Sequence, residues 1–171
     1  MTIRIGQGFD VHRFTNARGH PLILGGVVVE GAAGLMGHSD ADVVCHALAD
    51  AVLGAAGLGD LGTHFPDTDE QWAGADSTVL LAEVVGRVAA LGLRAVNADC
   101  TVVAEAPKLS PYTAAMAERL SGLLGAPVSV KATRAEGLGA LGRTEGIACL
   151  AVVLMSTDDP ASAPFSAPGA P

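Results

Sequence analysis

One aspartate and two histidines early in the chain have the residue types of a metal site. Asp10 and His12 flank a single residue in a segment of alternating polarity, and on a β-strand such a pair shares one face. His46 lies in an apolar segment that predicts a helix. If that helix packs on the strand, three protein ligands surround one open position, the pattern of catalytic zinc sites. The alternative is that these residues hold no ligand.

The helix expected to carry His46 also carries an aspartate one turn to either side. Asp42, His46 and Asp50 recur every fourth residue and form one polar stripe on an otherwise apolar helix. Either aspartate could accept a hydrogen bond from the imidazole and orient it toward a metal ion. A solvated helix face is the competing interpretation of the same stripe.

Other segments carry groups that suit a phosphate. His38, Ser39 and Asp40 stand at the predicted start of this helix, where backbone N–H groups and the helix dipole favour an anion. Lys108 follows a predicted strand and could pair with a phosphate, although a lone lysine is more often a surface residue. The glycine-rich residues 137–143 allow close approach to a ligand, but they match neither the dinucleotide-binding pattern nor the P-loop.

Composition argues against several classes of protein. The 171 residues include 18 Asp and Glu against 10 Lys and Arg, a formal net charge of −8, which disfavours a general nucleic-acid binder. Cys45, Cys100 and Cys149 lie far apart among apolar residues, which predicts buried thiols and not disulfides or a zinc ribbon. The N-terminus lacks the apolar run of a signal peptide, and no apolar stretch is long enough to span a bilayer. We therefore expect a soluble, cytoplasmic protein.

Patterning predicts the elements that must position these groups. The expected strands are 3–12, 22–24, 27–29, 98–104, 128–133 and 147–155. The expected helices are 39–56, 76–92 and 110–125. Ser39, Asp76 and Ser110 are the predicted N-caps of the three helices. We expect His20 and His64 to be surface residues without partners, and residues 60–69 to form a loop.

This order of elements predicts the fold class. Runs of strands and helices without strict alternation favour an α+β fold whose mostly antiparallel or mixed sheet is covered on one face. Residues 1–155 are expected to form a single domain. Residues 156–171 are rich in Pro, Ala and Ser, and we expect a flexible tail that takes no part in catalysis.

A series of short blocks runs in order from residue 4 to about residue 155. The blocks are Arg4-Ile5-Gly6-x-Gly8-Phe9-Asp10-Val11-His12, His38-Ser39-Asp40-x-Asp42, His46-Ala47-Leu48, Leu58-Gly59-Asp60-x-Gly62, Phe65-Pro66-Asp67-Thr68-Asp69, Gly74-Ala75-Asp76-Ser77, Ala104-x-Ala106-Pro107-Lys108, Lys131-Ala132-Thr133 and Gly142-Arg143-x-Glu145-Gly146-Ile147-Ala148. Each block alone is a weak signal. Together and in this order they closely resemble the 2-C-methyl-D-erythritol 2,4-cyclodiphosphate synthase family of the non-mevalonate isoprenoid pathway.

The resemblance implies one reaction of the phosphorus-oxygen lyase class. The family converts 4-diphosphocytidyl-2-C-methyl-D-erythritol 2-phosphate to 2-C-methyl-D-erythritol 2,4-cyclodiphosphate and releases CMP. The 2-phosphate of the substrate attacks the β-phosphorus of its own cytidine diphosphate, so no nucleophilic side chain is needed. Because two polyanionic groups must meet, the developing charge has to be neutralised, and metal ions can do this in an acidic protein.

The resemblance also assigns residues to these tasks. Asp10, His12 and His46 would hold a zinc-type ion, and Glu136 would help to hold a second ion, Mg²⁺ or Mn²⁺, that bridges the diphosphate. The implied catalytic residues are His38, Thr133 and Arg134. The implied substrate-binding residues are Asp10, Val11, His12, His38, Ser39, Asp60, Leu61, Gly62, Phe65, Pro66, Asp67, Thr68, Asp69, Ala104, Glu105, Ala106, Pro107, Lys108, Leu109, Ser110, Thr133, Arg134, Ala135, Glu136 and Arg143.

The sequence departs from the family pattern at two places that bear on function. The family has consecutive threonines after the Lys-Ala pair, whereas here Thr133 is followed by Arg134 and Ala135. The second of those threonines has a transition-state role in the family, and we expect Arg134 to take over that role. Ala140 stands where the family has a phenylalanine facing a central cavity.

The resemblance further implies a ferredoxin-like sheet and a homotrimer with active sites between subunits. The central cavity of such a trimer could hold an isoprenoid diphosphate, although Ala140 would remove an aromatic wall. Two other functions stay open. One is a zinc-dependent phosphate-ester hydrolase that uses the same three ligands, and the other is a non-enzymatic trimer that binds an isoprenoid diphosphate. The Lys108 block favours the synthase over a hydrolase, because a cytidine nucleotide needs such a partner.

Overall fold

The structure is a computed structural model that describes residues 1–17 and 19–157. Its elements in chain order are β1 (Thr2–Arg13), β2 (Pro21–Leu24), β3 (Val27–Ala33), α1 (Val43–Ala56), α2 (Leu61–His64), the 3-10 helix η1 (Glu70–Trp72), α3 (Ser77–Ala90), β4 (Leu93–Val103), α4 (Thr113–Leu124), β5 (Val128–Thr133), α5 (Gly139–Gly142) and β6 (Gly146–Thr157). Within this part of the chain, none of the helices has the length and apolar character that crossing a bilayer requires.

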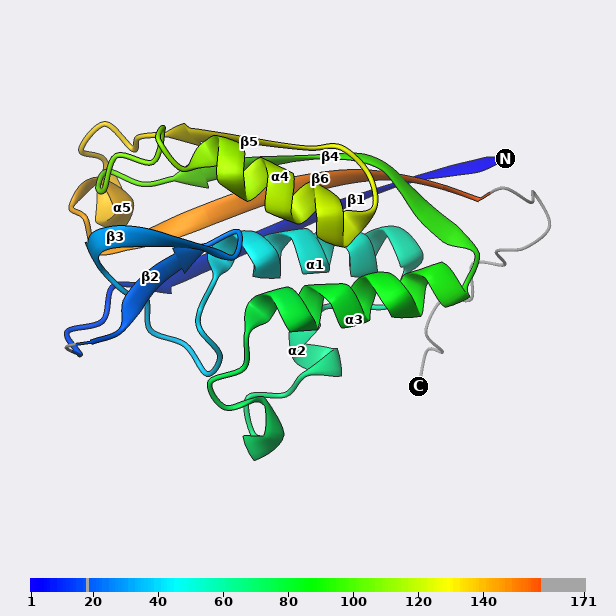
Figure 1. The fold of residues 1–171 in the computed structure, drawn as a ribbon, viewed down its shortest axis with the longest axis horizontal. Helices are drawn as coiled ribbons and strands as arrows, with labels where there is room; N and C mark the ends of the chain where they lie inside the picture. Colours follow the sequence, from blue (N-terminus) through cyan, green and yellow to red (C-terminus); the bar gives the residue numbers. More distant parts are fainter. Residues whose placement is uncertain (18, 158–171) are drawn as a thin grey trace.

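A mixed sheet with the strand order β1-β6-β4-β5 forms one layer of the fold. β6 is antiparallel to both β1 and β4, while β4 and β5 run parallel. The hairpin β2–β3 forms a separate small sheet. Helix α1 packs against β1 and β6, α4 packs against β5, and α3 packs against α1, so helices cover one face of the sheet (Figure 1). The predicted α+β class with a mixed sheet covered on one face is confirmed.

Two glycines let α1 lie directly on β1. Gly6 and Gly8 are buried and alternate along β1 with outward-facing residues. A Cβ atom at Gly6 would stand 1.8 Å from the carbonyl oxygen of Ala51, and one at Gly8 would stand 1.9 Å from that of Ala47. Only a residue without a side chain permits this approach. The contact brings the next inward residue of β1, Asp10, beside the turn of α1 that carries His46.

Helix α1 begins at Val43, so the prediction of Ser39 as its N-cap was wrong. The N-cap is Asp42, whose buried carboxylate accepts hydrogen bonds from the backbone N–H groups of Val44 at 3.0 Å and Cys45 at 3.1 Å. It also accepts from the N–H groups of Gly25 at 2.8 Å and Gly26 at 2.7 Å, in the turn of the β2–β3 hairpin. Asp42 therefore joins the hairpin to the helix and is not part of a solvated face.

Helix α4 and strand β6 also differ from their predicted limits. The helix begins at Thr113 with Tyr112 at the N-cap position, so Ser110 does not cap it. Strand β6 continues to Thr157, so Ser156 and Thr157 belong to the folded domain and not to the predicted tail. Thr157 is fully buried, and its Oγ1 accepts a hydrogen bond from the Thr2 N–H at 3.1 Å. The remainder of the predicted tail, residues 158–171, lies outside the described residues.

His64 is not the unpartnered surface residue that the sequence suggested. Its Nε2 lies 2.9 Å from the carbonyl oxygen of Leu58, and its Nδ1 lies 2.9 Å from Nη1 of Arg87 on α3. Because Arg87 can only donate, Nδ1 accepts and Nε2 donates. His64 therefore ties α2 to α3. The predicted burial of the three cysteines is confirmed, and all three are free thiols.

Candidate metal centre and active site

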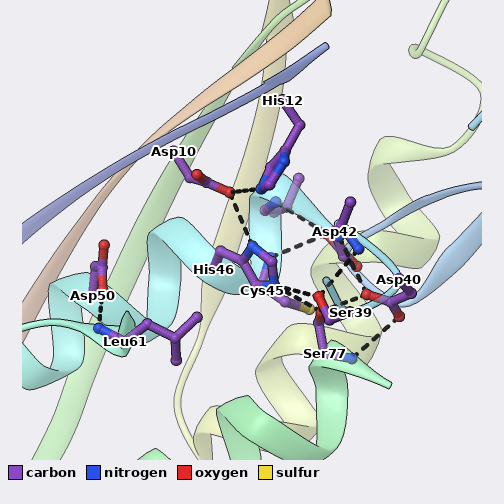
Figure 2. Close-up of polar contacts among 12 residues, drawn as sticks. Asp10, His12, Ser39, Asp40, Asp42, Cys45, His46, Asp50, Leu61 and Ser77 are labelled. Atoms are coloured by element: carbon purple, nitrogen blue, oxygen red, sulfur yellow. Dashed lines mark hydrogen bonds and ion pairs between the residues drawn. The ribbon is translucent and has the colours of Figure 1, made fainter. Parts of the chain in front are cut away.

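Asp10, His12 and His46 meet in space, as the sequence predicted. Oδ2 of Asp10 lies 3.1 Å from Nε2 of His12 and 3.0 Å from Nδ1 of His46 (Figure 2). The three potential ligand atoms all lie within 4.8 Å of one another, and among the described residues no other group of three His, Cys, Asp or Glu does so. Zinc bonds of 2.0–2.1 Å in tetrahedral geometry separate neighbouring ligand atoms by about 3.3 Å. The donor set and its spacing therefore fit a zinc-type ion.

Charges within this cluster shift the pKa values of its members. Burial would raise the pKa of Asp10, but hydrogen bonds and charge interactions with His12 and His46 together hold that pKa well below its usual range. The hydrogen bond to Asp10 raises the pKa of His12 above its usual value, against the opposing effect of burial. A negative carboxylate beside two imidazoles attracts positive charge, which either protons or a metal ion can supply.

Both imidazoles are oriented by a partner on the nitrogen that faces away from Asp10. Nδ1 of His12 lies 2.7 Å from the carbonyl oxygen of Met36 and donates to it, so Nε2, which faces Asp10, is the nitrogen that would ligate a metal ion. Nε2 of His46 lies 2.8 Å from Oγ of Ser77 and 3.1 Å from Oγ of Ser39. Partners of this kind fix the ring orientation of histidines that ligate metals.

The predicted partners of His46 were wrong. Asp42 binds backbone N–H groups at the start of α1, and Oδ1 of Asp50 accepts a hydrogen bond from the Leu61 N–H at 2.7 Å, which anchors α2 (Figure 2). Ser77, the first residue of α3, is the partner that sequence reasoning missed. It lies 31 residues from His46, and its only signal in the sequence was its place in the block Gly74-Ala75-Asp76-Ser77.

The cluster opens into a pocket of about 380 Å³, which we call the metal pocket. Its lining residues are His12, Gly37, His38, Ser39, His46, Leu61, Gly62, Phe65, Asp67, Trp72 and Leu80. His38, Ser39 and several residues of the predicted 60–69 loop thus lie in the same pocket as His12 and His46. Gly37, Trp72 and Leu80 were not predicted. Trp72 packs edge-on against Phe65 with 4.9 Å between the ring centroids, which closes one wall.

Some predicted binding residues do not line the metal pocket. The exposed side chain of Val11 lies on the opposite face of β1 from Asp10 and His12. Asp60 is the N-cap of α2 and accepts from the Thr63 N–H at 2.8 Å, and Asp69 is the N-cap of η1. Hydrogen bonds from Thr63 lower the pKa of Asp60. Pro66 and Thr68 are exposed in the same loop but are not lining residues.

The remaining predicted residues gather in a second pocket of about 640 Å³, the loop pocket. Its lining residues are Ala104, Glu105, Ala106, Pro107, Lys108, Leu109, Ser110, Ala132, Thr133, Arg134 and Glu136. Oε1 of Glu105 lies 4.0 Å from Nε of Arg134, and Oε2 accepts from the Gly137 N–H at 3.4 Å. Ala135 is half-buried between lining residues, while Arg143 lies outside both pockets and pairs with Glu145 at 2.7 Å.

The sequence matches the model of the YgbB family over residues 3–156. The chain belongs to the YgbB family. A relative of this YgbB chain is the 2-C-methyl-D-erythritol 2,4-cyclodiphosphate synthase of Symbiobacterium thermophilum, which is 58% identical over 155 residues. The match covers 89% of this YgbB chain and 98% of the relative.

Solved structures agree with the family assignment. The bifunctional IspDF of Campylobacter jejuni is similar with a TM-score of 0.87 and 43% identity, over 92% of this YgbB chain and 43% of that longer chain. The CDP complex of Plasmodium falciparum IspF is similar with a TM-score of 0.79 and 31% identity, over 92% and 97% of the two chains.

Proposed function

We propose that this protein converts 4-diphosphocytidyl-2-C-methyl-D-erythritol 2-phosphate to 2-C-methyl-D-erythritol 2,4-cyclodiphosphate with release of CMP. The observation that best supports this proposal is the cluster of Asp10, His12 and His46, whose two histidines line a pocket together with His38 and Ser39. Relatives more than half identical over nearly their whole length are named for this synthase activity. The protein therefore acts in isoprenoid precursor biosynthesis by the non-mevalonate route.

The reaction is an intramolecular phosphoryl transfer. An oxygen of the 2-phosphate forms a bond to the β-phosphorus, and the bond from that phosphorus to the bridging oxygen breaks. The bridging oxygen keeps the electron pair and leaves as part of CMP. Because the nucleophile belongs to the substrate, the protein has to fold the substrate back and stabilise charge, which are matters of positioning and electrostatics.

The residues of the metal pocket suit the first of these tasks. Asp10, His12 and His46 would hold a divalent ion, which as a Lewis acid would neutralise charge on the diphosphate oxygens. The exposed ring of His38 lines the same pocket, and its Nε2–H, which donates to the carbonyl oxygen of Asp69 at 3.2 Å, would turn to a phosphate oxygen when substrate binds. The aromatic wall of Phe65 and Trp72 limits the space available to water.

The loop pocket suits a cytidine nucleotide. Lys108 supplies a fixed positive charge, and the turn at residues 104–107 presents backbone groups to a ligand. A solved YgbB-type relative, the Plasmodium falciparum IspF, is a complex with CDP. We place the diphosphate near Thr133, Arg134 and Glu136, with Glu136 as a ligand of a second ion, Mg²⁺ or Mn²⁺. The backbone of Glu136 has a φ of 51°, a left-handed conformation that turns the chain sharply into Gly137.

The two pockets are formed by different parts of one chain, and we propose that a homotrimer joins them across subunits. On the face of the sheet that the helices leave uncovered, β1 and β6 present large exposed apolar side chains, whereas β4 and β5 present the Asp99–Lys131 ion pair. The apolar side chains are Ile3, Ile5, Phe9, Val11, Leu150 and Val152. A contiguous exposed apolar surface on a folded domain is typical of a subunit interface. The ferredoxin-like description of the sheet, a cytoplasmic location and an isoprenoid diphosphate in a central cavity stay predictions.

Release of CMP tests the proposed function. The purified protein with Zn²⁺ and Mg²⁺ is incubated with the cytidyl diphosphate substrate, and nucleotides are separated by anion-exchange chromatography. We expect CMP to accumulate as the substrate disappears, and to fall sharply with His46→Ala, which removes a metal ligand. An intact substrate pool after prolonged incubation with saturating metals contradicts the proposal.

A further inference from the structure

Ser77 joins a metal-site histidine to a carboxylate that is not itself a metal ligand. Ser77 is fully buried at the start of α3, and its Oγ lies 2.8 Å from Nε2 of His46. The same hydroxyl donates to Oδ1 of Asp40. Asp40 is held in place, because Oδ2 accepts from the Ser77 N–H at 3.1 Å and Oδ1 accepts from the Asp42 N–H at 3.2 Å. Figure 2 shows Ser77 and Asp40 on the side of His46 away from Asp10.

The direction of each hydrogen bond in this chain follows from its carboxylate end. An ionised carboxylate only accepts, so the proton between Ser77 and Asp40 belongs to the Ser77 hydroxyl. With that proton directed at Asp40, Oγ of Ser77 accepts from His46, and Nε2 of His46 therefore carries a proton. A neutral imidazole has one N–H group. With Nε2 protonated, Nδ1 of His46 is the nitrogen that can offer a lone pair to a metal ion, and this is the atom that faces Asp10 at 3.0 Å.

We propose that Asp40 and Ser77 are positioning residues that keep His46 in the tautomer able to bind a metal ion through Nδ1. The inference rests on the proposed function only in requiring a metal ion at this site. A hydrogen bond from the distal N–H of a ligating histidine toward a carboxylate fixes the ring and raises the basicity of the ligating nitrogen. Ser39 also lies 3.1 Å from Nε2 of His46, but the Ser77 hydroxyl is the one that contacts Asp40.

His12 provides an internal comparison. The nitrogen of His12 that faces away from Asp10, Nδ1, donates to the backbone carbonyl of Met36 and not to Ser77 or Asp40. The two imidazoles of the site are therefore oriented by separate partners. Loss of the Ser77 hydroxyl should affect His46 and leave the tautomer of His12 unchanged, which a general loosening of the fold would not do.

We call the hydrogen-bonded chain from His46 through Ser77 to Asp40 the relay. Its role is tested by measuring zinc affinity on metal-free protein without substrate, by competition with a chromophoric chelator. We expect Ser77→Ala to weaken zinc binding by about 10- to 100-fold, the range found when such supporting partners are removed. The matched control is Thr78→Ala, which removes a nearly buried hydroxyl one residue along that donates to Asp76 instead. The control should keep the parental affinity within about twofold.

Nitrogen-15 NMR of the histidine side chains in the zinc-loaded protein gives a second readout. We expect His46 to show a slowly exchanging Nε2–H that exchanges faster in Ser77→Ala, while the Nδ1–H signal of His12 stays as in the parent. A parental protein with the proton of His46 on Nδ1, or a Ser77→Ala variant with parental zinc affinity, overturns the inference. If the relay binds zinc as described but the protein releases no CMP, the proposed function fails and the relay stands.

Discussion

Asp10 and His46 are 36 residues apart in the sequence, yet Oδ2 of Asp10 lies 3.0 Å from Nδ1 of His46. The contact depends on the backbone-to-backbone approach of β1 and α1 that Gly6 and Gly8 allow. A metal site built between a strand and a helix needs their separation set to a few tenths of an ångström, because ligand distances vary little. The two glycines are therefore as important to the site as the ligands.

Gly8→Ala should destabilise the protein and weaken its metal site together. The new Cβ would stand 1.9 Å from the carbonyl oxygen of Ala47, so α1 must move away from β1. We expect a loss of about 3 kcal/mol in the free energy of unfolding, the upper range for overpacking, measured by urea denaturation. We also expect weaker zinc binding, because Asp10 and His46 separate.

The matched control for this substitution is Gly54→Ala, at an exposed position of α1. There the nearest atom to a new Cβ is the carbonyl oxygen of Gln7 at 3.8 Å, an ordinary contact. Alanine in place of glycine within a helix should stabilise by up to about 1 kcal/mol. Equal stability changes for Gly8→Ala and Gly54→Ala would contradict the tight β1–α1 contact.

The stability of the metal-free protein should fall as the pH rises from 6 toward 8. The pKa of His12 is raised above its ordinary value of 6.5, so its stabilising contribution is complete below that pH and is lost as the pH rises through the folded-state pKa. The pKa of Asp10 is depressed below 3.8, so its contribution is present above that pH and is lost only under strong acid. Zinc affinity should change in the opposite direction to stability, because zinc binding requires neutral His12.

Urea unfolding of the zinc-stripped protein across this pH range measures the effect. His12→Gln is the control, since it removes the titrating group and should flatten the dependence. An unchanged slope in the control would assign the pH dependence to other histidines.

Arg134 should contribute to the transition state, in the place where the family has a threonine. It lines the loop pocket opposite Glu105, with 4.0 Å between Nε and Oε1, and its guanidinium offers a fixed charge with several donors. We expect Arg134→Ala to slow turnover by about 10²-fold or more, the scale of losing one transition-state donor. Arg134→Thr should keep much of the rate. Unchanged turnover of Arg134→Ala at saturating metal would reduce the residue to a surface charge.

The uncovered face of the sheet should mediate assembly. Light scattering should give about three times the 17.1 kDa mass of the chain. Ile5→Lys, which places a charge on a residue 71% exposed on this face, should shift the protein toward monomers. Val79→Lys on α3, where the side chain is 58% exposed away from the sheet, should leave the trimer intact. A monomer that still forms the cyclic product would refute active sites between subunits.

Local patterns predicted most of the strands and the ligand set, because alternation along β1 and apolar spacing along α1 are properties of short segments. Contacts between distant segments escaped prediction. The sequence places Asp42 in a polar stripe on a helix, because nothing near it in the sequence shows that the hairpin turn at Gly25 and Gly26 donates to it. Ser77 was missed for the same reason.

The short helices were also missed. Helices α2 and α5 each have four residues, too few for a periodic pattern to appear. Because the sequence predicts a loop in place of α2, the contact of His64 with Arg87 on α3 could not be predicted. The division of the predicted binding residues between two pockets follows from the path of β4 and β5, which only the three-dimensional structure shows.

Phosphorus-31 NMR of the reaction with the cytidyl diphosphate substrate tests the central claim most directly. The triad of Asp10, His12 and His46 could equally hold an ion that activates water for hydrolysis, so the product decides between the two chemistries. Intramolecular transfer predicts the paired signals of a cyclic diphosphate with one equivalent of CMP and no inorganic phosphate. Inorganic phosphate without a cyclic product would contradict the synthase function and identify a phosphate-ester hydrolase.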